Sequence, residues 1–433
     1  MKLSVIGCGY LGAVHASAMA ELGHEVIGID VDPSKVEALQ AGRPPFFEPG
    51  LPEVLTSAGA TGRLRFSTDI SEVAEATVHF IAVGTPQSAD GYAADLKYVD
   101  AAIEALLPYL KEGDLIVGKS TVPVGTARRL ADRVAESGTG ARLAWNPEFL
   151  REGYAVKDTI EPDRLVYGVD DERDVEVLDG VYATAIGAGT PRIVTDYATA
   201  ELVKVAANAF LATKISFINA MSEIAEVTGA DITQLADAIG HDARIGRRFL
   251  NAGVGFGGGC LPKDIRAFTA RAEELGRGES VAFLKEVDAI NLRRRVRVVD
   301  LAVDALGGSP YGKKVAVLGV TFKPHSDDVR DSPALDVAVQ LKGLGADVVV
   351  TDPEGIDNAR LRHPQLLYTS ATEEALRHAD LVVLVTEWPE YVSLDPAHVK
   401  SIARGSIIID GRNTLDAAAW KAAGWQYVGM GRS

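Results

Sequence analysis

The sequence predicts an α/β protein with two doubly wound parallel-sheet domains joined by a central helical domain that contains one long helix. Three observations predict this fold class. Short apolar runs alternate with helical patterns in the first half, a long segment without Gly or Pro follows, and the alternation restarts after a "GGSP" breaker at 307–310. A chain of 433 residues has room for two or three domains. We expect domains at 1–195, 196–306 and 311–433.

The first domain is predicted from six apolar runs. Continuous apolar strands separated by helical patterns indicate a parallel sheet that is covered by helices on both faces. The runs are "KLSVIG" (2–7), "HEVIGID" (24–30), "VHFIAVG" (78–84), "DLIVGKS" (114–120), "RLVYGV" (164–169) and "RIVT" (192–195).

The central domain is predicted to be helical. No Gly or Pro occurs between Asp196 and Thr228, and the segment is rich in helix-forming residues, so we expect one long helix ended at Gly229. Helical sequence continues to about Leu306, and we interpret "RRRVR" (293–297) within it as a solvated helix face.

The last domain repeats the design of the first, because each opens with a basic residue and an apolar strand that ends in Gly. Only the first domain keeps a full glycine fingerprint. The strands expected in the last domain are "KKVAVLGV" (313–320), "ADVVVTD" (346–352), "LVVLVTE" (381–387) and "SIIID" (406–410).

The composition is that of a soluble globular protein, with 47% apolar and 24% charged residues. The formal net charge of −16 disfavours binding to nucleic acids and to anionic membranes. No apolar run is long enough to span a bilayer, and the first residues do not resemble a signal peptide. The two cysteines, Cys8 and Cys260, are therefore expected to be free thiols in a reducing cytoplasm.

A dinucleotide site is predicted at the first strand. Gly7, Gly9 and Gly12 have the G-x-G-x-x-G spacing between a strand and a helical pattern, as in Rossmann-like domains. Asp30 follows the second strand, where a carboxylate would bind the adenosine ribose and favour NAD over NADP. Asp32 is an alternative ribose ligand, and either acid could be a turn residue. "VGTPQ" (83–87) and "KSTVPVGT" (119–126) are candidate cofactor walls, although Ser and Thr also cap helices.

Two groups of side chains could support proton transfer. Glu201, Lys204 and Asn208 share one face of the long helix. A buried lysine could act as a base, but an exposed Lys204 is the more common situation. Glu148 and Glu152 in "WNPEFLREG" (145–153) could divide acid and base roles or form an ordinary surface pair.

Cys260 suggests a reaction. It follows five glycines in "GVGFGGGCLPKD" (253–264), a stretch whose backbone can approach a ligand, and Lys263 and Asp264 come next. A cationic neighbour or a helix N-terminus would stabilise the thiolate, but a buried structural cysteine is the alternative. Together with NAD, a thiol nucleophile could oxidise an aldehyde through a thiohemiacetal and a thioester.

The ordered motifs resemble the UDP-glucose/GDP-mannose dehydrogenase family over essentially the whole chain. The resemblance implies an NAD domain (1–195), a helical dimerisation domain with the catalytic cysteine loop (196–306) and a nucleotide-sugar domain (311–433). The motifs are "GCGYLG", "GTP", "KSTVPVGT", "NPEFLREG", "ELVKVAANAFLATKISFIN", "DARIGRRFLNAGVGFGGGCLPKD" and "GVTFKPHSDDVRDSPAL".

The resemblance implies four-electron oxidation of C6 of a nucleotide-linked hexose to a carboxylate by two NAD, in a homodimeric enzyme without a metal. Its implied catalytic residues are Cys260 as nucleophile, Lys204 with Asp264 for the hydroxyl proton, Asn208 at the reacting oxygen, and Thr121 with Glu148 for the hydrolytic water. Its implied NAD contacts are Gly7, Gly9, Tyr10, Leu11, Gly12, Asp30, Lys35, Thr85, Ser120, Thr121, Glu152, Lys263 and Arg330. Its implied substrate contacts are Glu148, Phe149, Leu150, Glu152, Lys204, Asn208, Asn251, Phe256, Gly257, Phe322, Lys323 and Arg412, with Arg244 reaching in from the neighbouring subunit.

Substrate choice is less defined than reaction type. "DARIGRRFL" resembles the UDP-glucose branch, while dTDP-glucose, GDP-mannose and a UDP-N-acetylhexosamine remain alternatives. Gly259 stands where the family usually has Ser, and Leu261 where Phe is frequent. A two-electron hydroxyacid dehydrogenase with a structural Cys260 is a second hypothesis, and a non-catalytic NAD-binding regulator is a third.

Overall fold

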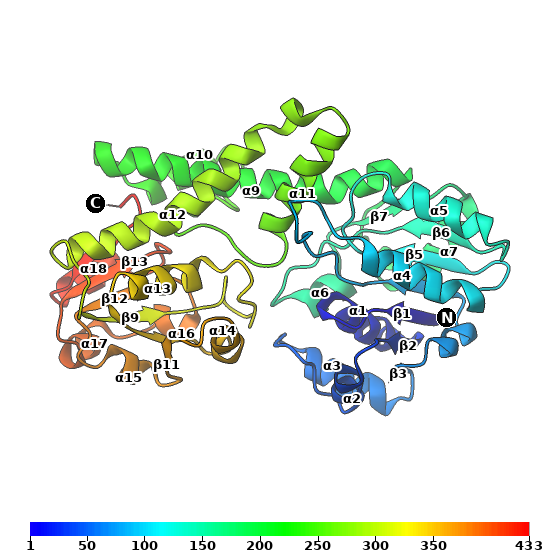
Figure 1. Ribbon diagram of the computed structural model, residues 1–433, viewed down its shortest axis with the longest axis horizontal. Helices are drawn as coiled ribbons and strands as arrows, with labels where there is room; N and C mark the ends of the chain where they lie inside the picture. The colour runs from blue at the N-terminus through cyan, green and yellow to red at the C-terminus, as the bar shows by residue number, and fades with distance from the viewer. Residues whose placement is uncertain (433) are drawn as a thin grey trace. The chain divides into compact units, whose positions relative to one another are not determined.

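The computed structural model describes residues 1–432 and divides into two compact units. The first unit contains Met1–Ala207 and Ala270–Gly278, and the second contains Asn208–Thr269 and the chain from Glu279 onward (Figure 1). Each unit is built around one sheet, as the sequence predicts. Within residues 1–432, no helix is both long and apolar enough to cross a bilayer.

The first unit contains an eight-stranded sheet in the order β3-β2-β1-β4-β5-β6-β7-β8. All neighbouring strands are parallel except β6 and β7, which are antiparallel. The expectation of a wholly parallel sheet is therefore wrong at this junction, because only the short helix α6 separates the two strands and no crossover returns the chain. The strands are β1 (Lys2–Ile6), β2 (Glu25–Ile29), β3 (Leu64–Ser67), β4 (Val78–Ile81), β5 (Leu115–Gly118), β6 (Arg142–Trp145), β7 (Leu165–Gly168) and β8 (Arg192–Thr195).

Helices cover both faces of this sheet (Figure 1). Alternate residues of one strand enter different cores, as where Leu115 packs with α1 and Ile116 packs with α4 and α5. This two-sided burial explains why the strands are apolar without interruption. The helices are α1 (Tyr10–Glu21), α2 (Pro33–Gln40), α3 (Leu51–Ala60), α4 (Lys97–Leu106), α5 (Thr126–Glu136), α6 (Ala155–Ile160), α7 (Glu172–Val181) and α8 (Ala183–Gly187), with 3₁₀ turns η1 (Ile70–Glu75) and η2 (Leu107–Tyr109).

The second unit contains a six-stranded parallel sheet in the order β11-β10-β9-β12-β13-β14. Its strands are β9 (Lys314–Leu318), β10 (Asp347–Thr351), β11 (Leu367–Tyr368), β12 (Leu381–Leu384), β13 (Ile407–Asp410) and β14 (Gln426–Gly429). Its helices after residue 330 are α13 (Pro333–Gly343), α14 (Ile356–Arg362), α15 (Thr372–Leu376), α16 (Pro389–Val392), α17 (Pro396–Ile402) and α18 (Ala417–Ala422).

The helical segment is dominated by α9 (Tyr197–Thr228), which confirms the predicted long helix. Its first residues belong to the first unit, and the helix from Asn208 onward belongs to the second. The other elements of this segment are α10 (Ile232–Gly240), α11 (Leu261–Glu274), η3 (Gly278–Val281) and α12 (Phe283–Ala305).

The interpretation of "RRRVR" as a solvated face is wrong for two of its arginines. Arg294 is fully buried, where it donates to Ser222 Oγ at 3.0 Å and lies 3.3 Å from Glu226 on α9. Arg295 is also buried and pairs with Asp331 at 2.8 Å. Both guanidinium groups are buried because α12 packs within the unit on more than one side, and each finds a carboxylate there.

Candidate functional site

The glycine turn after β1 has the geometry of a pyrophosphate cradle. Gly7 has a φ of +89°, which disfavours other residues, and a Cβ on Gly12 would lie 1.8 Å from Gly7 O, so helix and strand touch there. A Cβ on Gly9 would meet nothing within 4 Å. The backbone at Gly9 therefore faces open space at the N-terminus of α1, where phosphate oxygens are stabilised.

Asp30 lies at the end of β2 and is buried. Its carboxylate accepts a hydrogen bond from Cys8 N at 2.8 Å and pairs with Lys35 Nζ at 3.0 Å. Asp32 instead caps α2, because its side chain accepts from the amides of Ser34 and Lys35. This division of roles favours Asp30 over Asp32 as the ribose ligand.

Cys8, between Gly7 and Gly9, is packed inside the first core. It is buried, and burial together with the negative charge of Asp30 raises the pKa of its thiol. The group therefore stays protonated and contributes packing rather than chemistry.

The two candidate walls meet at the carboxyl edge of the first sheet. Thr85 Oγ1 donates to Thr121 O at 2.8 Å, and Ser120 Oγ donates to Val83 O at 2.7 Å. These bonds join the segments that follow β4 and β5. The side chains are thus not simple helix caps, and they lie along the edge where ligands of open α/β sheets bind.

Glu148 and Glu152 do not form an ordinary surface pair. Glu148 Oε1 accepts hydrogen bonds from the amides of Phe149 and Leu150, at 2.7 and 2.9 Å. Its other oxygen lies 3.1 Å from the ammonium of Lys119, and its side chain is 16% exposed. Glu152 is buried. The Glu148 carboxylate is thus held in position by the fold, which is what a catalytic role requires.

Glu48 is a residue that the sequence gave no reason to select. Its carboxylate is 2% exposed and accepts hydrogen bonds from Gly153 N at 2.6 Å, Ala155 N at 2.7 Å and the Tyr10 hydroxyl. Burial and the bond to Glu48 raise the pKa of Tyr10. A lone glutamate in a loop has no spacing signal, yet this one joins the first turn of α1 to the loop that contains Glu152.

The face of α9 that the sequence singled out contains two residues with different roles. Lys204 is only 9% exposed, so the expectation of a solvated lysine is wrong, and its ammonium lies 5.5 Å from the ring centre of Phe149. Glu201 accepts from the amides of Gly125 and Ala127 and so caps α5. Burial raises the pKa of Glu201.

In the second unit, Asn208 and Asp264 form a buried pair. Asn208 Nδ2 donates to one carboxylate oxygen of Asp264 at 2.7 Å, and Lys263 Nζ donates to the other at 2.7 Å. Cys260 immediately precedes α11, is exposed, and accepts Asp264 N on its carbonyl at 2.9 Å. A thiolate at the N-terminus of this helix would be stabilised by the helix dipole.

The glycines before Cys260 are required by the protein itself. A Cβ on Gly258 would lie 2.8 Å from the ring of Phe322, and one on Gly259 would lie 2.4 Å from the guanidinium carbon of Arg330. We expected these glycines to bring backbone close to a ligand. The close approaches that the structure shows are to other parts of the chain: the last three glycines approach the segment after β9, while a Cβ on Gly253 would meet Gly411 O and one on Gly255 would meet Asn291 Oδ1. The glycines therefore let the cysteine loop pack closely against these segments.

The remaining predicted substrate contacts in the second unit differ in exposure. Phe256 and Gly257 are buried, whereas Asn251 is exposed and accepts from Arg247 at 2.7 Å. Lys323 Nζ lies 5.4 Å from the ring centre of Phe322. The guanidinium of Arg412 donates to the carbonyls of Val385, Gly255 and Phe322, at 2.8–2.9 Å, which makes it a clamp between three segments.

Comparison with known proteins explains why these features occur together. Three models of one family match successive parts of the chain: the NAD binding domain over residues 1–186, the central domain over 198–293 and the UDP binding domain over 316–417. The chain belongs to the UDP-glucose/GDP-mannose dehydrogenase family. The resemblance inferred from the ordered motifs is thereby confirmed.

Members of this family are similar to the chain over its full length. A UDP-glucose 6-dehydrogenase of Rhizobium meliloti is 42% identical over 438 residues, covering 100% of both chains, and UDP-glucose 6-dehydrogenase YwqF of Bacillus subtilis is 40% identical, covering 100% of this chain and 98% of its own. The solved structure of a UDP-glucose dehydrogenase from Pyrobaculum islandicum has a TM-score of 0.91 at 42% identity and covers 100% of this chain and 98% of its own. A UDP-D-ManNAc dehydrogenase from Pyrococcus horikoshii has a TM-score of 0.87 at 25% identity and covers 100% of this chain and 99% of its own.

The NAD binding domain of the family fits the residues found at the first sheet edge. Gly9 leaves room for a pyrophosphate, and Asp30 presents a buried carboxylate at the end of β2. NAD is therefore the cofactor that this domain binds. Which residues contact it stays a prediction.

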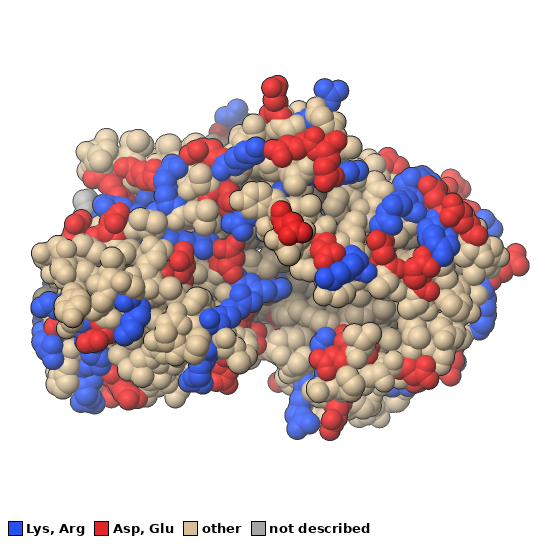
Figure 2. All heavy atoms as spheres, in the orientation of Figure 1, with Lys and Arg blue, Asp and Glu red and all other residues tan. Residues whose placement is uncertain are grey.

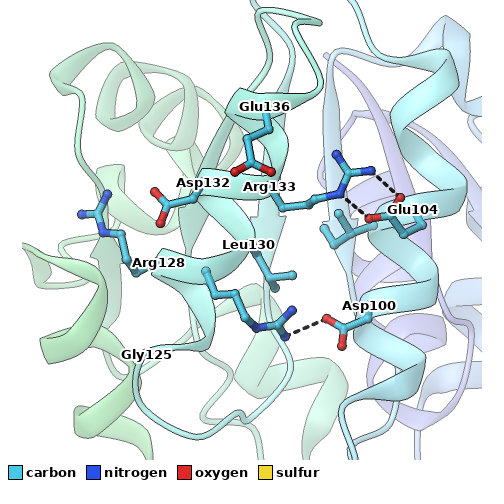
Figure 3. A pocket seen from close by; sticks show the side chains of 10 residues that line it. Asp100, Glu104, Gly125, Arg128, Leu130, Asp132, Arg133 and Glu136 are labelled. Carbon is cyan, nitrogen blue, oxygen red and sulfur yellow. Dashed lines mark hydrogen bonds and ion pairs between the residues drawn. The ribbon is translucent and has the colours of Figure 1, made fainter.

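The first unit also has a groove that is lined by other residues than these. A groove of about 470 Å³ runs between α4 and α5, and its charged side chains bind one another across it (Figure 3). Arg129 pairs with Asp100 and Arg133 with Glu104, both at 2.7 Å. Acidic and basic side chains are interleaved over this part of the surface (Figure 2). We assign no ligand to the groove, because four of its charged side chains already form ion pairs with one another.

Proposed function

We propose that the protein oxidises C6 of UDP-glucose from the alcohol to the carboxylate, giving UDP-glucuronate and reducing two NAD. The observation behind this proposal is Cys260, an exposed thiol at the start of α11, one helical turn before the clamped Asp264. Two-electron alcohol dehydrogenases do not need a nucleophile. The names of the relatives at about 40% identity support UDP-glucose as the substrate.

The proposed first oxidation uses Lys204, Asn208 and Asp264. Lys204 and Asn208 lie one turn apart on α9, and Asn208 is oriented by Asp264. Lys204 with Asp264 removes the proton of the C6 hydroxyl, while Asn208 donates a hydrogen bond to the reacting oxygen. NAD supplies the hydride acceptor for each oxidation. In the second oxidation, the sulfur of Cys260 adds to the C6 aldehyde, and the thiohemiacetal becomes a thioester.

Hydrolysis of the thioester completes the proposed cycle. Thr121 helps to position the hydrolytic water. The oxygen of this water adds to the thioester carbon, and a proton passes from the water to Glu148. The carbon–sulfur bond breaks with its electron pair returning to the sulfur of Cys260. No redox change occurs in this step, so the two NAD equivalents account for all four electrons.

The proposed ligand contacts are those that the resemblance to the family implies. The first unit would bind NAD through the glycine turn and Asp30, and the UDP binding domain of the second unit would bind the nucleotide sugar. We retain domain limits at 1–195, 196–306 and 311–433. The remaining proposed contacts are Tyr10, Leu11, Lys35, Thr85, Ser120, Glu152, Lys263 and Arg330 for NAD, and Phe149, Leu150, Asn251, Phe256, Gly257, Phe322, Lys323 and Arg412 for the sugar nucleotide.

The proposed enzyme is a cytoplasmic homodimer. Phe210, Phe217 and Ile224 are exposed at seven-residue intervals on α9, so they form one apolar stripe that a second copy would cover. Arg244 is 88% exposed and is held by Asp242 at 2.6 Å, a suitable arrangement for reaching a neighbouring subunit. Light scattering should give twice the chain mass, and Phe217→Glu should give a monomer with little activity.

The test of the proposed function is NADH release with product analysis. UDP-glucose, dTDP-glucose, GDP-mannose and their N-acetyl analogues are compared at equal concentration, and NADH is counted per sugar consumed. We expect two NADH per UDP-glucose consumed. We expect the kcat/KM for each of the other sugars to be at least about tenfold lower than the kcat/KM for UDP-glucose, a difference in activation free energy of about 1.4 kcal/mol. Release of one NADH per sugar would contradict the thioester mechanism. Normal acid formation by Cys260→Ala would contradict it as well.

A further inference from the structure

Lys119 is a buried lysine that the proposed reaction does not yet use. It follows β5, and its side chain is 4% exposed. Its ammonium donates to Asn146 Oδ1 at 3.1 Å and to the Tyr182 hydroxyl at 3.2 Å, and it lies 3.1 Å from Glu148 Oε2. A buried ammonium is costly unless its donors are satisfied, so this arrangement has a definite geometry.

The partners of Lys119 are themselves fixed. Asn146 Nδ2 donates to Val166 O at 3.0 Å, which turns its carbonyl oxygen toward Lys119. The Tyr182 hydroxyl donates to the same oxygen at 2.6 Å, and its ring lies 5.7 Å from the ammonium. The ammonium therefore has few alternative positions, and its remaining polar contact is with the carboxylate of Glu148.

Lys119 and Glu148 line a small cavity of about 30 Å³, and other charged groups border this cavity. Asp158 is paired with Arg151 at 2.7 Å, and Arg164 stacks on Phe149 at 3.9 Å from its ring centre; Asp163 also lines the cavity. His15 is wholly buried there, and burial together with the charge of Lys119 lowers its pKa well below the usual value. His15 is thus neutral, and Lys119 forms an ion pair with Glu148.

The two oxygens of Glu148 have different surroundings. One accepts two backbone amides, and the other faces Lys119, so the carboxylate cannot rotate without losing bonds. We propose that Lys119 is a positioning residue for thioester hydrolysis, whose buried ammonium holds the Glu148 carboxylate in the orientation that accepts the proton of the attacking water. The inference rests on the proposed function, because it assigns a partner to the base of the last step.

The test separates hydrolysis from the two oxidations. Lys119→Met keeps most of the side-chain volume and removes the charge. Rapid mixing with NAD and UDP-glucose should still give a burst of about two NADH per subunit, whereas steady turnover should fall about 100-fold, within the range of general-base catalysis. Mass spectrometry of the quenched protein should then find a nucleotide-sugar acyl group on Cys260. Lys111→Met, which removes an exposed lysine of the same unit, should behave as wild type.

Lys119→Ala gives a second measurement if the methionine variant does not fold. Ethylammonium should fill the vacated ammonium site and restore turnover, while equal ethanol should not. Wild-type turnover by Lys119→Met would overturn the inference, and so would loss of the burst in a folded variant or failure of ethylammonium to rescue Lys119→Ala. If wild-type protein itself gives no second NADH, the proposed function fails instead, so the two failures are distinguishable.

Discussion

Glu48 accepts hydrogen bonds from the loop that contains Glu152, so its substitution tests what fixes this loop. The Glu48→Ala substitution removes the acceptor of two buried backbone amides, those of Gly153 and Ala155. Gly153 N keeps a second acceptor, the Tyr10 hydroxyl at 3.2 Å, so the Ala155 amide is the buried donor that is left without a partner, which should cost about 1–3 kcal/mol. Loss of the Tyr10 hydroxyl bond adds to this cost. Because the substituted position is local to one loop, the cost should appear as local opening before global unfolding.

Hydrogen exchange measured by mass spectrometry reads this opening directly. Peptides that cover residues 148–160 should exchange at least about fivefold faster in Glu48→Ala than in wild type, since about 1.4 kcal/mol corresponds to about tenfold and about 1 kcal/mol to about fivefold. The exchange of peptides from the second unit should be unchanged. Glu53→Ala is the matched control, because Glu53 lies nearby on α3 and is exposed. Unchanged exchange in the loop of Glu48→Ala would refute the reasoning.

Three further predictions concern the glycine turn and the thiols. Gly9→Ala should melt like wild type but bind NAD at least about tenfold more weakly by fluorescence titration, because its Cβ enters open space that the pyrophosphate needs. Gly12→Ala should lower the melting temperature, because its Cβ would meet Gly7 O at 1.8 Å; equal melting of the two variants would contradict the assignment. Iodoacetamide should label one thiol of the native protein at pH 8, Cys260, because Cys8 is buried and its raised pKa keeps it protonated. A label on Cys8 before unfolding would be inconsistent with this packing.

Glu201 also predicts a pH effect on stability. Burial raises its pKa, so between the unfolded and folded values the native state binds more protons than the unfolded state. Glu201 therefore favours folding at a pH below its pKa in the unfolded state, and this contribution to stability is lost as the pH rises through its pKa in the folded state. Glu201→Gln should flatten this dependence in urea titrations between pH 4 and about 6. Identical pH slopes for the variant and wild type would exclude the effect.

The apolar runs identified most strands of both sheets, including the edge strand β8, but they did not include the buried interior strand β6 or the edge strands β3, β11 and β14. β3 (Leu64–Ser67) and β14 (Gln426–Gly429) are outer strands of four residues with polar members, and the sequence did not indicate them. An edge strand is buried on fewer sides, so its composition is less constrained. The sequence also did not indicate that β6 and β7 are antiparallel. Apolar runs do not encode the direction of a strand, and a short connection permits the antiparallel arrangement.

The candidate site was predictable where motif and backbone geometry coincide, as at Gly7, Gly12 and Asp30. Burial of lysines was not predictable. Lys204 and Lys119 are buried by residues distant in the sequence, Phe149 for the first and Tyr182 for the second. Helical periodicity places a residue on a face, but it does not say what packs against that face. Tertiary contacts therefore decided which of the candidate charged groups are held inside the fold.

The two sheets show how one turn design yields different ligand sites. Gly7 N donates to Ile29 O and Gly319 N donates to Thr351 O, both at 2.8 Å, so the two turns have the same backbone connection. The acids after the second strands also correspond: Asp30 accepts from Cys8 N at 2.8 Å and Asp352 from Val320 N at 2.7 Å.

The difference lies in what fills the space beyond these turns. By position, Thr321 replaces Gly9 and Pro324 replaces Gly12, and the next helix, α13, begins only at Pro333. Asp352 is further occupied by Trp388 Nε1 at 3.1 Å. A pyrophosphate at the second turn would lack both the open backbone and the helix N-terminus, so the second sheet must bind its nucleotide in another way. Within residues 1–432, NAD is therefore left with one turn of this kind, that of the first sheet, so the proposed reaction would reduce its two NAD molecules one after the other at one site.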